Sequence, residues 1–318
     1  MAAIRTRGMR RTFGGVTAVA GLDLDVEAGE IFGLVGPDGA GKTTTLRMLT
    51  GILPPTAGSI EVAGCDVVRQ PGGVKDRIGY LSQRFGLYPD LTVAENLAFH
   101  ADLQGVPPAE MPARTARLLG FSGLDAFHRR LAGDLSGGMK QKLGLACALI
   151  HTPRILFLDE PTNGVDPVSR RDFWRILHQL VREGVTILVS TAYLDEAERC
   201  SRLALLHEGR VLALGTPGEV KSILPGSLLE VRTADSRKAC LVLRARLPES
   251  RVVLFGDRIH VTAADAAAAG RRISEALAAE GLPPESVRPV EPSLEDVFVA
   301  VLARPALPGS GAEAPSSP

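Results

Sequence analysis

A glycine-rich segment, residues 36–44, is the first part of the sequence whose residue types suggest chemistry. It contains one lysine and two threonines. It follows the apolar run 31–35 and precedes a stretch of helical spacing at 44–49. In that context the glycines let backbone N–H groups surround phosphates, and the helix N-terminus adds its positive dipole end. Lys42 would neutralise phosphate charge, and the Thr43 hydroxyl would ligate Mg²⁺. An inert glycine turn before a helix is the alternative reading of this motif alone.

Two adjacent acids follow a second apolar run, residues 155–158. Asp159 would lie at the carboxyl end of a buried strand, where a carboxylate can hold Mg²⁺ from the side opposite Thr43. Glu160, one residue further, could reach the water that attacks a terminal phosphate and act as its general base. The alternative is that these acids cap a helix, which would explain one of the two residues more readily than both.

A second helix start that could receive an anion occurs at residues 135–141, where Ser136 stands at the N-cap position before two glycines. This segment is separate from the first phosphate loop. Two helix N-termini directed at one nucleotide suggest that the second serves a neighbouring copy of the chain.

These motifs, in this order and spacing, resemble the ATP-binding subunits of ABC transporters over about residues 4–220. The resemblance rests on residues 36–44, 83, 135–141, 156–161 and 163–166. It implies that ATP and Mg²⁺ are bound and that two ATP-binding subunits, identical or different, associate head to tail. Each ATP would lie between the phosphate loop of one copy and Ser136, Gly137 and Gly138 of the other.

The resemblance also implies a role for each site residue. The catalytic residues would be Glu160, Gln83 and Lys42, and the Mg²⁺ ligands Thr43, Gln83 and Asp159. The adenine ring would stack on Phe13. Nucleotide-binding residues would be Phe13, Gly36, Pro37, Asp38, Gly39, Ala40, Gly41, Lys42, Thr43, Thr44, Ser136, Gly137 and Gly138.

Two positions depart from the family pattern. Asp38 brings a carboxylate near a polyanion, and we expect its side chain to face away from the phosphates. Ala192 stands where the family places a histidine that senses the terminal phosphate, and an alanine offers no donor. By analogy with the loss of one oxyanion-hole donor, hydrolysis would slow by roughly 10²–10³. Thr191 or Tyr193 could supply a substitute donor.

A membrane partner is implied by the apolar residues Phe85, Leu87 and Tyr88, which occur in a loop rich in glycine and proline. In the family this region receives the transmembrane permease subunit. Packing of the three side chains on neighbouring helices is the alternative. We expect a peripheral protein at the cytoplasmic face of the inner or plasma membrane.

The elements that must position these residues predict an α/β fold, and the resemblance implies that its core is a P-loop NTPase core of ABC type. Alternating residues in the first 35 positions indicate an antiparallel β subdomain, and short apolar runs indicate a mixed sheet. We predict an ATP-binding domain at 1–224 with a helical insert at about 85–150. A small α+β accessory domain would follow at 225–303, and residues 304–318 would form a disordered tail.

Composition excludes several other classes of protein. The 36 basic and 36 acidic residues cancel, and aromatic residues make up 4% of the chain, so we expect no nucleic-acid partner. Four dispersed cysteines argue for a reducing compartment and against a disulfide framework. Apolar runs fall short of the ~20 residues that cross a bilayer. We expect no zinc site.

The function that these observations favour is hydrolysis of ATP to energise export of a small molecule through a separate transmembrane partner. The accessory unit and the ending at residues 291–298 resemble those of multidrug and antibiotic efflux ATPases. One alternative is a soluble regulatory ATPase of the same superfamily. Another is a nucleotide-gated module with little turnover, which Ala192 makes credible.

Overall fold

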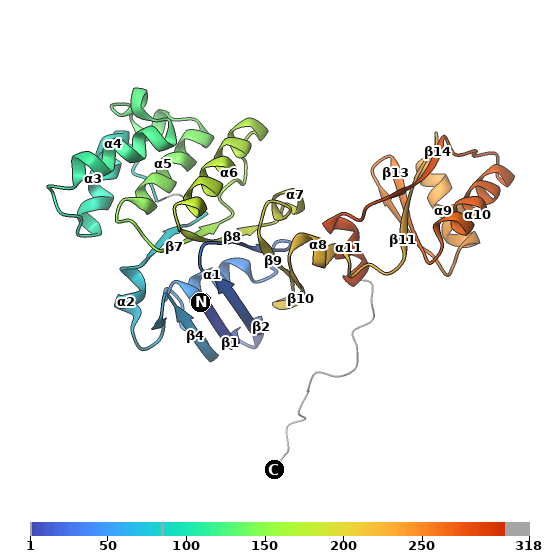
Figure 1. Cartoon of the computed structure of the whole chain (residues 1–318), viewed down its shortest axis with the longest axis horizontal. Coiled ribbons are helices and arrows are strands. Elements are labelled where there is room, and N and C mark those ends of the chain that lie inside the picture. The colour runs from blue at the N-terminus through green and yellow to red at the C-terminus, as the bar shows by residue number, and fades with distance from the viewer. Residues whose placement is uncertain (1, 84–85, 303–318) are drawn as a thin grey trace, which may run out of the picture. The chain divides into compact units, whose positions relative to one another are not determined.

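The computed structural model describes residues 2–83 and 86–302 (Figure 1). Two compact units divide between Pro217 and Gly218. The boundary predicted after residue 224 lies seven residues further along the chain. The predicted tail at 304–318 lies outside the described residues.

A six-stranded sheet forms the centre of the first unit. Strands β3, β6, β7, β8 and β9 run parallel, and β10 pairs antiparallel with β9 at one edge. The order is β10-β9-β3-β8-β7-β6. The bounds are β3 Ile31–Val35, β6 Ile78–Leu81, β7 Ile155–Asp159, β8 Thr186–Thr191, β9 Arg202–His207 and β10 Arg210–Gly215. Every residue of β3, β7 and β8 is buried, which explains their unbroken apolar runs.

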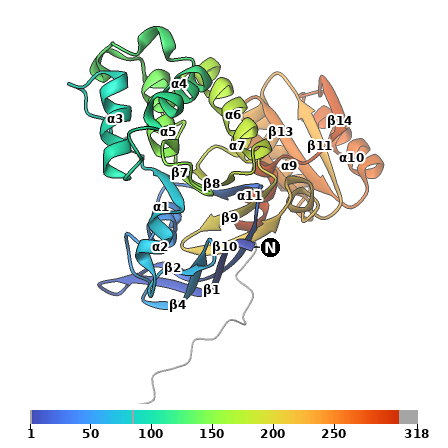
Figure 2. The same cartoon turned by 60° about the vertical axis from the view of Figure 1, so that its left-hand side comes forward.

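The predicted antiparallel β subdomain is present as a second sheet of order β2-β1-β4-β5. Its strands are β1 Ala2–Phe13, β2 Val16–Glu27, β4 Ala57–Val62 and β5 Cys65–Asp66. Figures 1 and 2 show these strands on one side of the parallel sheet and helices α3 to α6 on the other.

Helices cover the remaining surface of the parallel sheet. Helix α1 begins at Lys42, directly after the glycine-rich loop, and α5 begins directly after Ser136. Pro112 lies in the first turn of α4, where proline is tolerated, so it does not interrupt this helix. The helices of this unit are α1 Lys42–Leu49, α2 Pro71–Lys75, α3 Val93–Leu103, α4 Met111–Ser122, α5 Gly137–Leu149, α6 Pro167–Arg182 and α7 Leu194–Ala197.

Two apolar clusters pack against opposite faces of this sheet. On β7, Leu156 and Leu158 join the cluster of the helical insert, whereas Ile155 and Phe157 join the cluster shared with α1 and the antiparallel sheet. This alternation fixes the register of β7, so the residues that follow it leave the sheet at a defined edge. In parallel sheets that edge is where ligands bind.

The second unit contains helix α8, three longer helices and an antiparallel sheet of order β12-β13-β11-β14. Strand β14 was not predicted because it is polar and contains Pro289, which an edge strand tolerates. The core, which includes Leu229 and Val231, packs under α9 and α10. Bounds are α8 Pro217–Lys221, β11 Ser227–Arg232, α9 Ser236–Arg246, β12 Arg251–Phe255, β13 Arg258–Ala263, α10 Ala266–Ala279, β14 Ser286–Val290 and α11 Leu294–Leu302.

Candidate nucleotide-binding site

The loop between β3 and α1 has the backbone geometry of a phosphate-binding loop. Gly41 is the N-cap of α1 with φ 98°. A Cβ atom there would lie 2.5 Å from the Ala18 carbonyl oxygen, and one at Gly36 would lie 2.2 Å from the Leu206 carbonyl oxygen. Both positions therefore require glycine. The first N–H groups of α1 remain available to an anion.

Lys42 is buried, with 4% of its surface exposed, and its side chain is held in place by this loop. Its ammonium group donates to the carbonyl oxygens of Gly36, at 2.8 Å, and Pro37, at 3.0 Å. It also lies 3.0 Å from Oε1 of Glu160. A buried ammonium with a carboxylate partner is satisfied electrostatically, and phosphate oxygens could take the place of that carboxylate.

Glu160 is the point where several site residues meet. Its backbone has φ 48°, a strained conformation for a residue with a Cβ atom. The Glu160 N–H donates to Ser190 Oγ at 3.0 Å. Its Oε2 accepts from Gln83 Nε2 at 3.3 Å and from Asn163 Nδ2 at 3.4 Å. These contacts hold the carboxylate at the edge of the parallel sheet.

Oxygen ligands suited to Mg²⁺ lie beside the loop. Thr43 Oγ1 donates to Asp159 Oδ1 at 3.0 Å, and Ser190 Oγ donates to the same oxygen at 2.8 Å. A hydroxyl and a carboxylate are the hard oxygen donors that Mg²⁺ prefers, so the donor set fits this ion. Gln83 contacts Glu160 instead of this pair. Tyr80 approaches Asp159 Oδ2 at 3.5 Å, and burial together with Asp159 raises the pKa of Tyr80 to about 12.

A cavity of about 520 Å³ brings most of the predicted nucleotide residues together. Phe13 lies at the end of β1 and is 44% exposed, with the Arg11 guanidinium 4.5 Å from its ring centroid. The Asp38 side chain is 95% exposed, and its nearer oxygen lies 4.0 Å from Lys42 Nζ. The cavity is lined by Phe13, Ala18, Asp38, Gly39, Gly41, Lys42, Thr43, Thr44, Gln83, Glu160 and Asn163.

The second helix start lies outside this cavity. Ser136 accepts a hydrogen bond from the Met139 N–H at 3.3 Å and caps α5. Ser136 and Gly137 are exposed, whereas Gly138 is buried against Ser169. Within one chain, therefore, residues 136–138 are not part of the lining of the cavity around the phosphate loop.

The surroundings of Ala192 contain a small cavity of about 130 Å³ that Glu160 and Tyr193 also line. The Tyr193 hydroxyl donates to Asn163 Oδ1 at 3.4 Å, and Asn163 contacts Glu160. Thr191 instead donates to Glu196, a fully buried carboxylate, at 2.7 Å. Of the two substitute donors considered from sequence, Tyr193 is thus the one connected to the site.

Sequence reasoning missed the contributions of Ser190 and Asn163. Ser190 could have been suspected as a polar residue near the carboxyl end of an apolar strand. Its pairing with Asp159 depends on β7 and β8 being neighbours, which the sequence does not reveal. Asn163 belongs to a motif noted in the sequence but had received no role.

The predicted docking residues differ in their surroundings. Leu87 packs against the apolar cluster of the helical insert, as the alternative interpretation expected. Tyr88 is 46% exposed, and its ring contacts that of Phe99 with centroids 4.5 Å apart. Phe85 lies outside the described residues. In the described ranges, no helix has the length and apolar character needed to cross a membrane.

The comparisons with known proteins agree with this geometry. A family model described as ABC transporter matches residues 19–163. The probable multidrug ABC transporter ATP-binding protein YbhF of Escherichia coli (strain K12) is 43% identical over 95% of this chain and 52% of YbhF. The daunorubicin/doxorubicin resistance ATP-binding protein DrrA of Streptomyces peucetius is 39% identical over 96% of this chain and 93% of DrrA.

A solved structure also shares the fold. It is described as cbiO1 from Clostridium perfringens, part of the ABC transporter complex cbiONQ, and aligns with TM-score 0.65 and 25% identity. The alignment covers 78% of this chain and 96% of that chain. The chain spans about half the length of the YbhF proteins that it matches.

Proposed function

This chain belongs to the ATP-binding proteins of ABC transporters, and from that premise we propose that it hydrolyses ATP to energise export of a small molecule through a separate transmembrane partner. The observation that carries the proposal is the convergence of Lys42, Glu160 and the Thr43–Asp159 pair at one edge of the sheet. The names of the relatives support export, because they refer to multidrug transport and to daunorubicin resistance.

In this proposal each site residue has a separate role in the transfer of the terminal phosphoryl group to water. Lys42, positioned by two loop carbonyls, neutralises charge on the transferred phosphoryl group. Mg²⁺, held by Thr43 and Asp159, supplies further charge neutralisation when bound. Glu160 accepts a proton from the attacking water or orients it, while Gln83 and Asn163 hold its other oxygen.

A second ATP-binding subunit completes the site in this proposal. Residues 136–138 do not line the cavity around their own phosphate loop, yet they form a helix N-terminus suited to an anion. In a head-to-tail pair each copy would present this helix end to the nucleotide of the other.

The transmembrane partner would dock on the exposed rings of Tyr88 and Phe99. Leu103 follows Phe99 by one turn of α3 and is also exposed, so the three residues form an apolar docking patch. The chain would then act as a peripheral subunit at the cytoplasmic face of the membrane.

Steady-state ATP hydrolysis by the purified chain tests the proposal. Glu160→Gln should lower kcat by about 10²–10⁴, as expected for loss of a general base, with ATP affinity retained. Glu275→Gln, an exposed acid of α10, is the matched control and should leave kcat unchanged. A Glu160→Gln variant that turns over at the parent rate would contradict the catalytic assignment.

A second candidate function, a module that closes on ATP with little turnover, is favoured by Ala192 and the small cavity beside it. The two candidates differ in one observable. If the parent chain associates on ATP but shows no hydrolysis above that of Glu160→Gln, the nucleotide-gated module is the correct description.

A further inference from the structure

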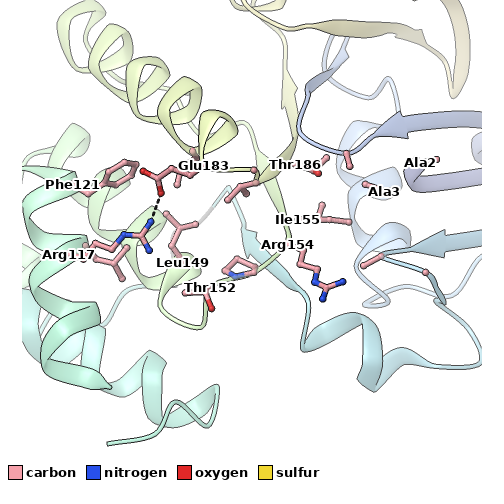
Figure 3. A pocket seen from close by; sticks show the side chains of 18 residues that line it. Ala2, Ala3, Arg117, Phe121, Leu149, Thr152, Arg154, Ile155, Glu183 and Thr186 are labelled. Atoms are coloured by element: carbon pink, nitrogen blue, oxygen red, sulfur yellow. Dashed lines mark hydrogen bonds and ion pairs between the residues drawn. The ribbon is translucent and has the colours of Figure 1, made fainter. Parts of the chain in front are cut away.

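A cavity of about 540 Å³ lies in the first unit at the edge of the parallel sheet opposite the nucleotide site (Figure 3). Ile155 and Thr186, the first residues of β7 and β8, line it, whereas the nucleotide site lies where these strands end. The two cavities share no lining residue. The volume lies within the ~300–1,000 Å³ typical of small-molecule pockets.

The walls of this cavity are mostly apolar. Figure 3 shows Phe121 of α4 on one side and Ala2 and Ala3 of β1 on the opposite side. Leu149 and Leu180 add aliphatic surface from α5 and α6. The alanines leave open the space that larger side chains would fill. Walls that are mostly apolar, with a few polar groups among them, are typical of pockets for small molecules with an apolar body.

The charges around the cavity do not balance. Arg117 is paired with Glu183 across the cavity wall, as the dashed line in Figure 3 marks. Arg154 is exposed and has no hydrogen bond or ion pair from its guanidinium group within residues 2–83 and 86–302. One cation therefore remains uncompensated beside an apolar space, and a planar guanidinium is suited to a carboxylate.

From this combination we infer that the cavity binds a small apolar carboxylate, with the apolar body between α4 and β1 and the carboxylate on Arg154. A medium-chain fatty acid is the simplest ligand of this class. Such a ligand would contact both the helical insert and the antiparallel sheet, at a distance from the nucleotide.

Calorimetric titration of the full chain with decanoate, in saturating Mg-ADP to occupy the nucleotide site without hydrolysis, tests the inference. We expect one decanoate per chain and binding at least about tenfold weaker for decanol, because the alcohol cannot form the charge-assisted bond to Arg154. Arg154→Gln should weaken decanoate binding by a similar factor and leave decanol binding unchanged. Arg237→Gln, another exposed arginine, is the matched control.

Filling the cavity is a second, independent test. Ala3→Phe should abolish binding of both decanoate and decanol, because the phenyl ring would occupy the cavity. If Ala3→Phe perturbs packing, Arg154→Gln still tests the site, because Arg154 is exposed and its replacement should not disturb the core. The inference is wrong if decanoate does not bind, if it binds no more tightly than decanol, or if Arg154→Gln binds it as tightly as the parent chain.

Discussion

Glu160, to which we assign the general-base role, is held in a strained backbone conformation. Its positive φ turns the chain sharply after β7, and hydrogen bonds from its N–H group to Ser190 over-determine that turn. The same turn places its carboxylate between Lys42 on one side and Gln83 with Asn163 on the other. The Glu160 carboxylate is thus oriented by Lys42 and Gln83, which are distant in sequence, and by Asn163, three residues further along the chain.

Ala192 is the residue at which we expect turnover to be limited. Ala192→His should raise kcat several-fold or more with little change in ATP affinity, because the added imidazole would donate mainly to charge that develops in the transition state. The small cavity that Ala192 lines offers space near the new side chain. Steady-state kinetics and equilibrium nucleotide titration measure the two quantities.

Tyr193→Phe is the companion measurement. If Ala192→His is no faster than the parent chain, another donor already acts there. The Tyr193 hydroxyl, which reaches Glu160 through Asn163, is then the first candidate, and its removal should lower kcat. If neither variant changes kcat, the proposed shortage of a donor is wrong.

Among the helices, α3 and α11 both begin at side-chain caps that fix where the helix starts. Helix α3 begins at a capping box formed by Thr92 and Glu95, and this fixed start sets which side chains face outward. Helix α11 has a comparable start, in which Ser293 and Asp296 exchange hydrogen bonds. For α3 we predict a docking surface, and for α11 we predict sensitivity to acid.

The apolar docking patch, Tyr88 with Phe99 and Leu103, belongs to the first of these helices. Tyr88→Ser with Phe99→Ser should release a tagged chain from the membrane fraction of the cells that naturally produce it, because two exposed rings are lost from the proposed interface. Leu241→Ser, an exposed apolar residue of α9, is the control. Unchanged sedimentation with membranes, with ATP binding intact, would exclude the patch as the docking surface.

The hold of α11 on its sheet should weaken in acid. Burial raises the pKa of Asp296, but hydrogen bonds from His260 and Ser293 outweigh this and keep it below the ordinary value of 3.8. Because the pKa is lowered, the ionised carboxylate stabilises the folded unit at pH values above 3.8. The contribution is lost as the pH falls through the lowered pKa.

Hydrogen exchange of α11 amides, corrected for the intrinsic effect of pH, measures this loss between about pH 5 and about pH 3. Asp296→Asn should remove most of the acid dependence, whereas Glu295→Gln, an exposed acid on the same helix, should preserve it. Equal acid dependence in Asp296→Asn and the parent chain would contradict the role of this carboxylate.

For the whole molecule, the phosphate loop and the two acids could be predicted because each follows an apolar strand within a few residues. Local patterns also predicted the antiparallel β subdomain and the α+β character of the second unit. The contacts of Ser190 and the cavity beside Arg154 could not be predicted, since they depend on which distant segments pack together. Strand β14 was missed because its residues lack the apolar alternation of a strand.

The division into units predicts that nucleotide binding belongs to the first. The nucleotide-site residues all precede residue 194, so a chain ending at Leu224 should bind a fluorescent ATP analogue with an affinity within about twofold of the full chain. Circular dichroism confirms that the shortened chain is folded. A folded chain that has lost ATP affinity would show that this division is wrong.

The central claim is that two copies complete each ATP site, and light scattering of Glu160→Gln with Mg-ATP tests it most directly. We predict a dimer at micromolar concentration with ATP and a monomer without it, because slow hydrolysis preserves the closed state. Adding Ser136→Glu should place a carboxylate against the partner's nucleotide and return the protein to a monomer that still binds ATP. A chain that stays monomeric in saturating ATP, or a dimer that Ser136→Glu does not disturb, would contradict the account.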